Sequence, residues 1–264
     1  MLSESMMNRT LSAWERIDWL ETTAPPVLDE GQLHIWRIPL DRLRQQGGLC
    51  SFLSSEEISR AERLRVPEKR EAFIAARAAL RVVLARYLGL APRQVELAYL
   101  SDGKPQLADP EMAAQLQFNL SHSGDWMVLA LSAGVPVGVD VEQVRSVRAN
   151  GWALAQLFCA AERETLAALP EEQRDAAFIA AWTMKEAVGK ADGRGVRVRV
   201  DTTGLIQEWF SDTEAQPLRF GSFAGYQIVH FNPAPGFCAS LALAAELPAR
   251  LRFLNLAKNW IETV

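Results

Sequence analysis

The stretch FNLSHSGDWMVLALSAGVPVGVDVE, residues 118–142, lies near the middle of the chain and decides the expected fold. Its apolar runs at 118–120, 126–131 and 137–141 are short and separated by turn residues, which predicts three strands. The segment Ser132–Pro136 contains both Gly and Pro, so it predicts a joint between two parts of the chain.

Regular elements are expected on both sides of this stretch. Upstream, periodicity and capping residues predict a strand, two helices and a strand at 33–38, 54–65, 68–88 and 95–100. Downstream, two helices and four strands are expected at 152–169, 171–191, 196–200, 218–220, 226–231 and 237–243. Strand, helices and strands therefore occur in this order twice, which predicts an α+β protein with two halves of similar plan.

The expected division of the chain has four parts. Residues 1–30 form an acidic N-terminal appendage, 31–134 an N-terminal α+β half, 135–250 a C-terminal α+β half, and 251–264 a C-terminal tail. The appendage carries six acidic and two basic residues, whereas the remaining chain has 26 of each. The chain after residue 30 therefore has no formal net charge. This does not favour nucleic-acid binding, which needs a broad basic face.

Composition narrows the class of protein further. Hydrophobic residues make up 49% and charged residues 23% of the 264, which is typical of a globular protein. The three cysteines, Cys50, Cys159 and Cys238, are too scattered for a disulfide framework or a zinc site, which favours a cytoplasmic protein. Neither a signal peptide nor a run long enough to cross a membrane is expected.

An acidic pair occupies the predicted strand 137–141 and its end. On a strand, Asp140 and Glu142 share one face and Val139 and Val141 the other, so valines in the core would leave two carboxylates at the surface. Carboxylates suit a hard cation such as Mg²⁺. The alternative is a solvated acidic strand end.

A mixed stripe runs along the predicted helix 171–191. Phe178, Trp182, Glu186 and Lys190 are spaced four apart, so one face changes from aromatic to charged. Such a face indicates a helix whose far end meets a polar site. The alternative is a surface pair of Glu186 and Lys190.

Two segments offer groups for an anion. Ser121 and His122 end the strand that begins at Phe118, where a hydroxyl and an imidazole can bind phosphate. A Ser/His hydrolase pair is disfavoured because adjacent strand residues face opposite sides. Lys104 lies in the turn Asp102–Pro105, which exposes its ammonium group for an anion. The alternative is a lysine that is merely solvated in a turn.

A basic segment precedes them in the chain. Residues 60–86 contain eight Arg or Lys against three Glu. Guanidinium groups suit phosphates, although most of these side chains are expected only to solvate helix faces. Arg60 and Arg63 share one helix face, and Arg77 and Arg81 share another.

Together these segments resemble the 4′-phosphopantetheinyl transferases of the larger, surfactin-type class, over roughly residues 31–250. The resemblance rests on Gly103-Lys104-Pro105, Phe118–Ser123, Gly138–Glu142, and Trp182–Ala187 with Lys190 and Gly193. It implies two pseudo-symmetric α+β halves with the active site in the cleft between them. The first half would bind coenzyme A, and the second would carry the Mg²⁺ ligands and catalytic residues.

The resemblance implies an enzyme that transfers 4′-phosphopantetheine from coenzyme A to a serine of an apo carrier protein, acyl, peptidyl or polyketide. The reaction would be Mg²⁺-dependent and release 3′,5′-ADP. By resemblance, the metal ligands are Asp140, Glu142 and Glu186, and the catalytic residues are Asp140, Glu186 and Lys190. Lys190 could neutralise charge on the leaving group. Glu186, directly or through a metal-bound water, could take the serine proton.

The resemblance also implies a set of coenzyme A contacts. These are Arg60, Arg63, Lys104, Ser121, His122, Lys185 and Lys190. In one branch of the family lysines hold the 3′-phosphate, whereas this helix offers Glu57, Arg60 and Arg63, so the choice of arginine stays open.

The expected partners are coenzyme A and apo carrier proteins with an acidic helix, without nucleic acid or membrane. A chain that contains both halves is expected to act as a cytoplasmic monomer. Two alternatives are a coenzyme- or carrier-binding module without catalysis and an unrelated metal-dependent phosphohydrolase.

Overall fold

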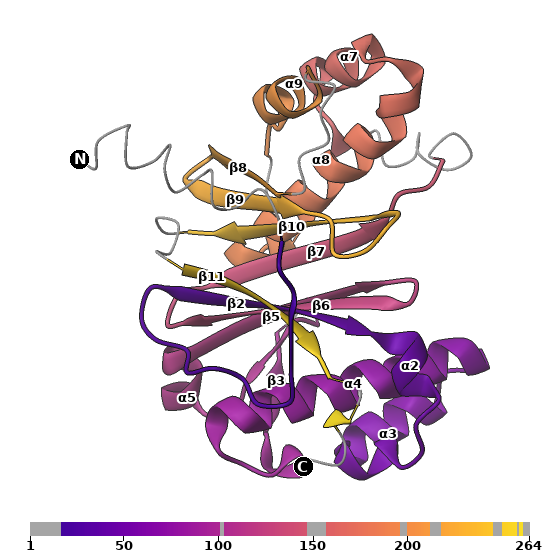
Figure 1. Ribbon diagram of the computed structural model, residues 1–264, viewed down its shortest axis with the longest axis vertical. Coiled ribbons are helices and arrows are strands. Elements are labelled where there is room, and N and C mark those ends of the chain that lie inside the picture. The colour runs from indigo at the N-terminus through magenta and orange to yellow at the C-terminus, as the bar shows by residue number, and fades with distance from the viewer. Residues whose placement is uncertain are drawn as a thin grey trace.

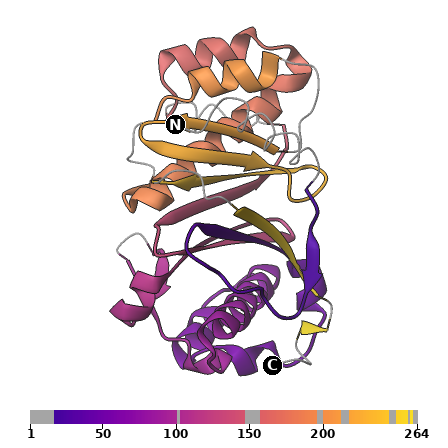
Figure 2. The same cartoon turned by 60° about the vertical axis from the view of Figure 1, so that its left-hand side comes forward.

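The computed structural model describes residues 17–100, 103–146, 157–195, 200–211, 218–244, 250–257 and 259–260. Helices and strands both contribute, which confirms the α+β class, and they form four layers: helices, sheet, sheet, helices (Figure 1). The turned view shows the same order, with both sheets in the middle (Figure 2). Residues 152–156 of one predicted helix and 196–199 of one predicted strand lie outside the described residues.

The N-terminal half contains two main helices and the strands around them. Its elements are β2 (Gln32–Pro39), α2 (Leu40–Arg44), η1 (Leu49–Phe52), α3 (Ser55–Glu62), α4 (Pro67–Leu88), η2 (Pro92–Gln94), β3 (Leu97–Tyr99), β4 (Pro105–Leu107), α5 (Pro110–Gln115), β5 (Leu116–Ser123) and β6 (Trp126–Ala133). Ser54 begins α3 as the sequence predicts: its hydroxyl accepts the Glu57 N–H, and the Glu57 carboxylate accepts the Ser54 N–H.

The C-terminal half repeats the sequence of strand, helices and strands. Its elements are β7 (Val137–Gln143), α7 (Ala160–Ala168), α8 (Glu171–Asp192), α9 (Thr203–Ser211), β8 (Leu218–Phe223), β9 (Tyr226–Phe231) and β10 (Phe237–Leu243). The strands form an antiparallel sheet in the order β7-β10-β9-β8. Nearly every predicted strand and helix is present, often a few residues longer or shorter than predicted.

The two ends of the described chain differ from the expected division. β1 (Leu20–Thr22) and β11 (Arg250–Leu256) pair in parallel, and β11 pairs in parallel with β2. The N-terminal sheet therefore has the order β1-β11-β2-β6-β5. Residues expected in an appendage and in a tail thus complete one sheet, because the hydrogen bonds of β2 need a partner at its free edge.

Three apolar cores separate the four layers. One lies between α4 and the five-stranded sheet, and another between α8, α9 and the four-stranded sheet. The third joins the two sheets and includes Leu33 and Ile35 of β2 with Val139 and Val141 of β7. The two valines therefore face the core, as their alternation predicts.

A close contact between β7 and α8 brings the polar segments of the C-terminal half together. A Cβ added at Gly138 would lie 2.0 Å from the Ala187 carbonyl oxygen and 2.4 Å from the Ala191 nitrogen. Strand and helix backbones can approach this closely only because Gly138 has no side chain. The acidic residues of β7 consequently lie beside the charged end of α8.

Within the described ranges, none of the helices combines the length and apolar character that crossing a bilayer requires.

Candidate active site

A cavity of about 390 Å³ lies where the two halves meet. Its lining combines side chains of α4, the β3–β4 turn and β5 with side chains of α8, and includes Arg77, Lys104, Ser121, His122, Glu186 and Lys190. Five of these six are residues that the sequence analysis proposed. The fold therefore assembles one polar site from segments more than 100 residues apart.

Asp140 is 4% exposed and is hydrogen-bonded to two residues that line this cavity, Ser121 and Lys190. Its Oδ1 accepts hydrogen bonds from Ser121 Oγ and from Lys190 Nζ, each at 2.7 Å. Its Oδ2 is buried and has no hydrogen-bond partner among the described residues. A buried carboxylate oxygen without a partner is costly, so this atom indicates a site for a cation or donor group.

Side chains of β5 reach across to β7 in a regular pattern. Asn119 Oδ1 accepts the Val139 N–H at 2.8 Å, and Ser123 Oγ donates to Glu142 Oε2 at 2.7 Å. Together with the Ser121–Asp140 bond, these bonds involve every second residue of β5 and reach Val139, Asp140 and Glu142 of β7. The two strands belong to different sheets, so side-chain hydrogen bonds join the halves here.

Asn119 and Ser123 were not among the predicted site residues. A sequence signal for them existed, because Asn119, Ser121 and Ser123 alternate in step with the acidic residues of β7. The sequence alone could not show that the two strands lie side by side.

Burial and repulsion act on the acidic residues together. Burial raises the pKa of Glu142, and the Asp140 charge raises it further, while the Ser123 hydrogen bond lowers it. Burial likewise raises the pKa of Glu186, and the charges of Asp140 and Glu142 add to this effect. Like charges collected in a partly buried site favour the binding of a cation.

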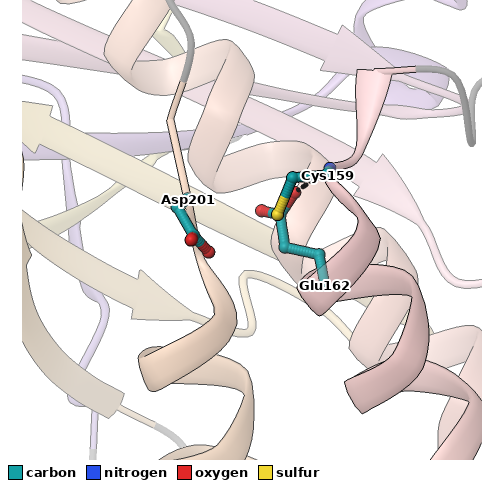
Figure 3. Close-up of side chains that lie close together, drawn as sticks. All are labelled: Cys159, Glu162 and Asp201. Atoms are coloured by element: carbon teal, nitrogen blue, oxygen red, sulfur yellow. Dashed lines mark hydrogen bonds between the residues drawn. The ribbon is translucent and has the colours of Figure 1, made fainter.

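The three carboxylates suit a hard cation by their chemistry, but their oxygens are not yet gathered around one point. Among the described residues, the group with ligand atoms within 4.8 Å of one another is Cys159, Glu162 and Asp201, shown in Figure 3. At the cavity, Lys190 neutralises Asp140 instead. The chemistry of this donor set suits Mg²⁺, because carboxylate oxygens are the ligands that a hard cation prefers and Asp140 Oδ2 has no described partner.

Lys104 connects the two halves at the cavity. Its Nζ donates to the carbonyl oxygen of Lys190 at 2.5 Å and to that of Val137 at 3.3 Å. Lys190 in turn donates to the Val139 carbonyl oxygen at 3.1 Å. Both ammonium groups are thereby held at the junction of β7 and α8.

Lys185 is one of the predicted site residues that do not line the cavity. Its Nζ lies 2.7 Å from Glu162 Oε1 and also donates to the Val200 carbonyl oxygen. Successive helix residues point about 100° apart, so Glu186 and Lys185 cannot both face the cavity. We therefore exclude Lys185 from the proposed phosphate contacts.

Arg77 of α4 lines the cavity and was expected only as an alternative. Its guanidinium lies 5.4 Å from the Phe73 ring centroid and 5.5 Å from that of Tyr99. Its Nη1 is buried without a hydrogen-bond partner among the described residues. A buried guanidinium with an unused donor is suited to an anionic ligand.

The other three arginines differ in their distance from this site. The Arg60 guanidinium lies 5.6 Å from the centroid of the same Phe73 ring. Burial lowers the pKa of Arg77, and the charge of Arg60 lowers it further. Arg63 is exposed at the end of α3, and no described contact connects it to the cavity. Arg81 is buried in an ion pair with Glu57, at 2.5 Å.

His122 completes the cavity lining on β5. Burial lowers its pKa, and the charges of Arg77 and Lys190 lower it further. The imidazole is therefore neutral at neutral pH and can donate or accept a hydrogen bond without adding charge.

Comparisons with known proteins agree with this arrangement. Residues 136–242 match the family model of the 4′-phosphopantetheinyl transferase superfamily, and residues 43–134 match the model of the N-terminal part of 4′-phosphopantetheinyl transferase. The matches thus cover both halves that form the cavity.

Individual relatives carry the same description. The 4′-phosphopantetheinyl transferase HetI of Nostoc is 34% identical over 227 residues, which are 86% of this chain and 93% of that protein. AcpT of Salmonella typhimurium is 37% identical over 59% of this chain and 78% of its own length. Sfp of Bacillus subtilis is 27% identical over 64% of this chain and 75% of its own length. The chain therefore belongs to the 4′-phosphopantetheinyl transferase superfamily.

Proposed function

We propose that this enzyme transfers 4′-phosphopantetheine from coenzyme A to a serine of an apo carrier protein and releases 3′,5′-ADP. The observation that carries the proposal is the cavity itself. Its lining combines Arg77 of α4 and Lys104 of the β3–β4 turn with Glu186 and Lys190 of α8. Asp140 of β7 adjoins it through hydrogen bonds with Ser121 and Lys190, which both line the cavity. Such a site can hold a cation and a pyrophosphate together.

Mg²⁺ would be held by Asp140, Glu142 and Glu186. When bound, it supplies charge neutralisation for the phosphate oxygens of the substrate. The carboxylates also need this charge, because burial and mutual repulsion raise the pKa of Glu142 and of Glu186. Glu142 is further oriented by Ser123.

The phosphate groups of coenzyme A would be held by side chains from both halves. We assign Lys190 to the pyrophosphate, because its ammonium lies beside Asp140 in the cavity. Lys104 and the neutral His122 are neighbouring contacts, and Ser121 orients Asp140. Arg77 lines the cavity and is therefore the best placed arginine for the 3′-phosphate, while Arg60 lies over the same Phe73 ring.

The transfer step forms one phosphorus–oxygen bond and breaks another. The carrier serine oxygen attacks the phosphorus next to pantetheine, and the bond from that phosphorus to the oxygen of 3′,5′-ADP breaks. Glu186, directly or through water, takes the serine proton, and its raised pKa makes it a stronger base than an ordinary carboxylate. Lys190 stabilises the charge that develops on the leaving phosphate.

Both sides of the cavity come from one chain, so we propose that the enzyme acts as a monomer. We further propose that it works in the cytoplasm, on carriers whose acidic helix lies near the target serine. The two α+β halves, proposed to be pseudo-symmetric, would divide the work: the first binds coenzyme A, and the second binds the metal and carries the catalytic groups.

The proposal is tested by mixing the protein with fluorescent coenzyme A, Mg²⁺ and several apo carriers. We expect labelling of at least one carrier, and loss of labelling when the target serine is replaced by alanine. Asp140→Asn should abolish labelling, whereas Asp41→Asn on the exposed face of α2 should not. Coenzyme A binding without transfer to any carrier, or release of inorganic phosphate from coenzyme A, would contradict the proposal.

A further inference from the structure

Glu162 is a buried carboxylate outside the cavity, with no exposed surface. It lies on α7 and accepts four hydrogen bonds: from Lys185 Nζ at 2.7 Å, Thr202 N at 2.8 Å, Thr202 Oγ1 at 2.6 Å, and Cys159 N at 2.7 Å. These contacts connect α7, α8 and the start of α9. The hydrogen bonds outweigh burial and lower the pKa of Glu162, so it is ionised at neutral pH.

The gathering of Cys159, Glu162 and Asp201 in Figure 3 does not make this place a metal site. Both oxygens of Glu162 already accept hydrogen bonds. Asp201 Oδ1 accepts the N–H and the hydroxyl of Thr203, at 2.9 and 2.5 Å. A metal ion here would also meet the positive charge of an ammonium group bound to Glu162.

The partner of Glu162 is the residue directly before a proposed catalytic group. Lys185 is 8% exposed, and its Nζ lies 5.1 Å from the Phe158 ring centroid. Because adjacent helix residues point about 100° apart, anchoring Lys185 on α7 fixes the direction in which Glu186 points. Lys190, five residues later, is fixed by the same rotation of the helix.

Contacts on the other sides of α8 combine close backbone approaches with the hydrogen bonds of Lys190 to Val139 and Asp140. Gly138 and Gly189 bring backbones together, where an added Cβ would lie 2.0 Å from the Ala187 oxygen and 2.4 Å from the Gly195 oxygen. The Gly138 contact holds the helix close to β7, and the Gly189 contact brings the helix close to the segment that follows it. A charged pair with defined hydrogen bonds adds the directional constraint that small residues lack.

We propose that the Glu162–Lys185 ion pair is a positioning device that holds α8 so that Glu186 and Lys190 face the cavity. A buried ion pair gives little net stability, because desolvation offsets most of the Coulomb attraction. Its directional bonds instead select one orientation of the helix. This inference rests on the proposed function for its effect on catalysis, but not for its effect on the helix.

The test replaces both charges together in Glu162→Gln/Lys185→Met, because a single change would leave one buried charge uncompensated. We expect a melting temperature close to wild type, kcat reduced about tenfold, and KM for coenzyme A changed less than threefold. KM should change little because Arg77, Lys104 and His122 come from the other half. Amide hydrogen exchange should become faster in the last two turns of α8.

Three further variants make the test decisive. Lys185→Arg keeps the charge and should retain most of kcat. Glu162→Asp keeps the charge but shortens the side chain, and should lower kcat without changing the melting temperature. It tests the proposal if the double variant does not fold. Arg44→Met/Asp125→Asn removes an exposed ion pair of the other half and should change neither kcat nor exchange in α8.

A folded double variant with wild-type kcat and wild-type exchange in α8 would overturn the inference. If the double variant exchanges faster in α8 but the wild-type protein labels no carrier, the proposed function is refuted and the positioning role stands. If Arg44→Met/Asp125→Asn lost as much kcat as Glu162→Gln/Lys185→Met, the loss would reflect general destabilisation, and the positioning role would be contradicted.

Discussion

Asp140 shows at the scale of one residue how the site balances charge. Its Oδ1 is neutralised by Lys190, while its Oδ2 has no described partner. The other two carboxylates have raised pKa values. Burial, and then repulsion among the carboxylates, disfavours their ionised forms here, and perturbed groups of this kind cluster at functional sites.

Glu186→Gln should reduce carrier labelling by about a hundredfold or more, because general-base catalysis contributes factors of this size. The melting temperature should stay equal or rise, since the change removes repulsion with Asp140 and Glu142. The comparison is Glu164→Gln on the exposed face of α7, which should keep full activity. Near-wild-type labelling by the Glu186 variant would remove this residue from the mechanism.

Arg77→Met should raise KM for coenzyme A by roughly ten- to a hundredfold, the equivalent of one charge-assisted hydrogen bond. It should also reduce the preference for coenzyme A over dephospho-coenzyme A, because the 3′-phosphate binds but does not react. Steady-state kinetics with both donors measure this. Arg63→Met, exposed and away from the cavity, should behave like wild type. The reverse ranking of the two variants would place the 3′-phosphate at α3.

The elements hold these residues in place by pairing and by close contact. β5 and β7 lie side by side although they belong to different sheets, and α8 packs on β7 through Gly138. The cavity therefore depends on two strands and one helix keeping their mutual distance. Changes that separate these elements should affect activity and stability together.

Gly138→Ala tests the contact of β7 with α8. The new Cβ would lie 2.0 Å from the Ala187 carbonyl oxygen, so the strand and helix must move apart. We expect a loss of about 3 kcal/mol or more in unfolding free energy, together with loss of labelling. Gly204→Ala in α9 has open space around it and should be neutral or stabilising. Urea denaturation of both variants decides the matter.

The N-terminal segment takes part in the fold as an element. Trp19 packs edge-on against Phe253, at 5.2 Å between ring centroids. The Arg37 guanidinium lies 4.5 Å from the centroid of the Trp19 ring. A chain shortened to begin at Gly31 should keep its coenzyme A KM but lose roughly 2–4 kcal/mol of unfolding free energy. Thermal melts and kinetics measure the two effects separately. An unchanged melt would show that β1 is dispensable, as an appendage would be.

The whole molecule should respond to acid through its histidines. The chain has three, and burial lowers the pKa of His34 to about 4 and that of His230 to about 3. Between these values and 6.5, the unfolded chain binds more protons than the folded one, so stability falls as pH falls. Protonation of Glu142 and Glu186, whose pKa values are raised, opposes this loss in part.

Unfolding free energy should therefore decrease by a few kcal/mol between pH 7 and 4.5, about 1.4 kcal/mol for each histidine and pH unit. Urea denaturation at several pH values measures it. NMR titration should show His34 and His230 neutral down to pH 5. A titration midpoint near 6.5 for either would contradict the prediction.

Local patterns in the chain were enough to predict most of the elements and to identify the family motifs. Hydrophobic alternation located β2, short apolar runs located β5, β6 and β7, and the serines at 54 and 55 indicated the start of α3. These signals are local, since the residues that decide them are neighbours in the chain. The acidic residues of β7 and the charged end of α8 could be identified as site candidates for the same reason.

Only the tertiary structure decided which side chains meet. It directed Lys185 to Glu162 and Arg77 into the cavity, although both had been candidates for phosphate contacts. It also placed β11 beside β2, more than 200 residues away, and aligned β5 with β7. Packing of distant segments fixes these outcomes, and the free energy of such packing depends on surfaces that no local pattern contains.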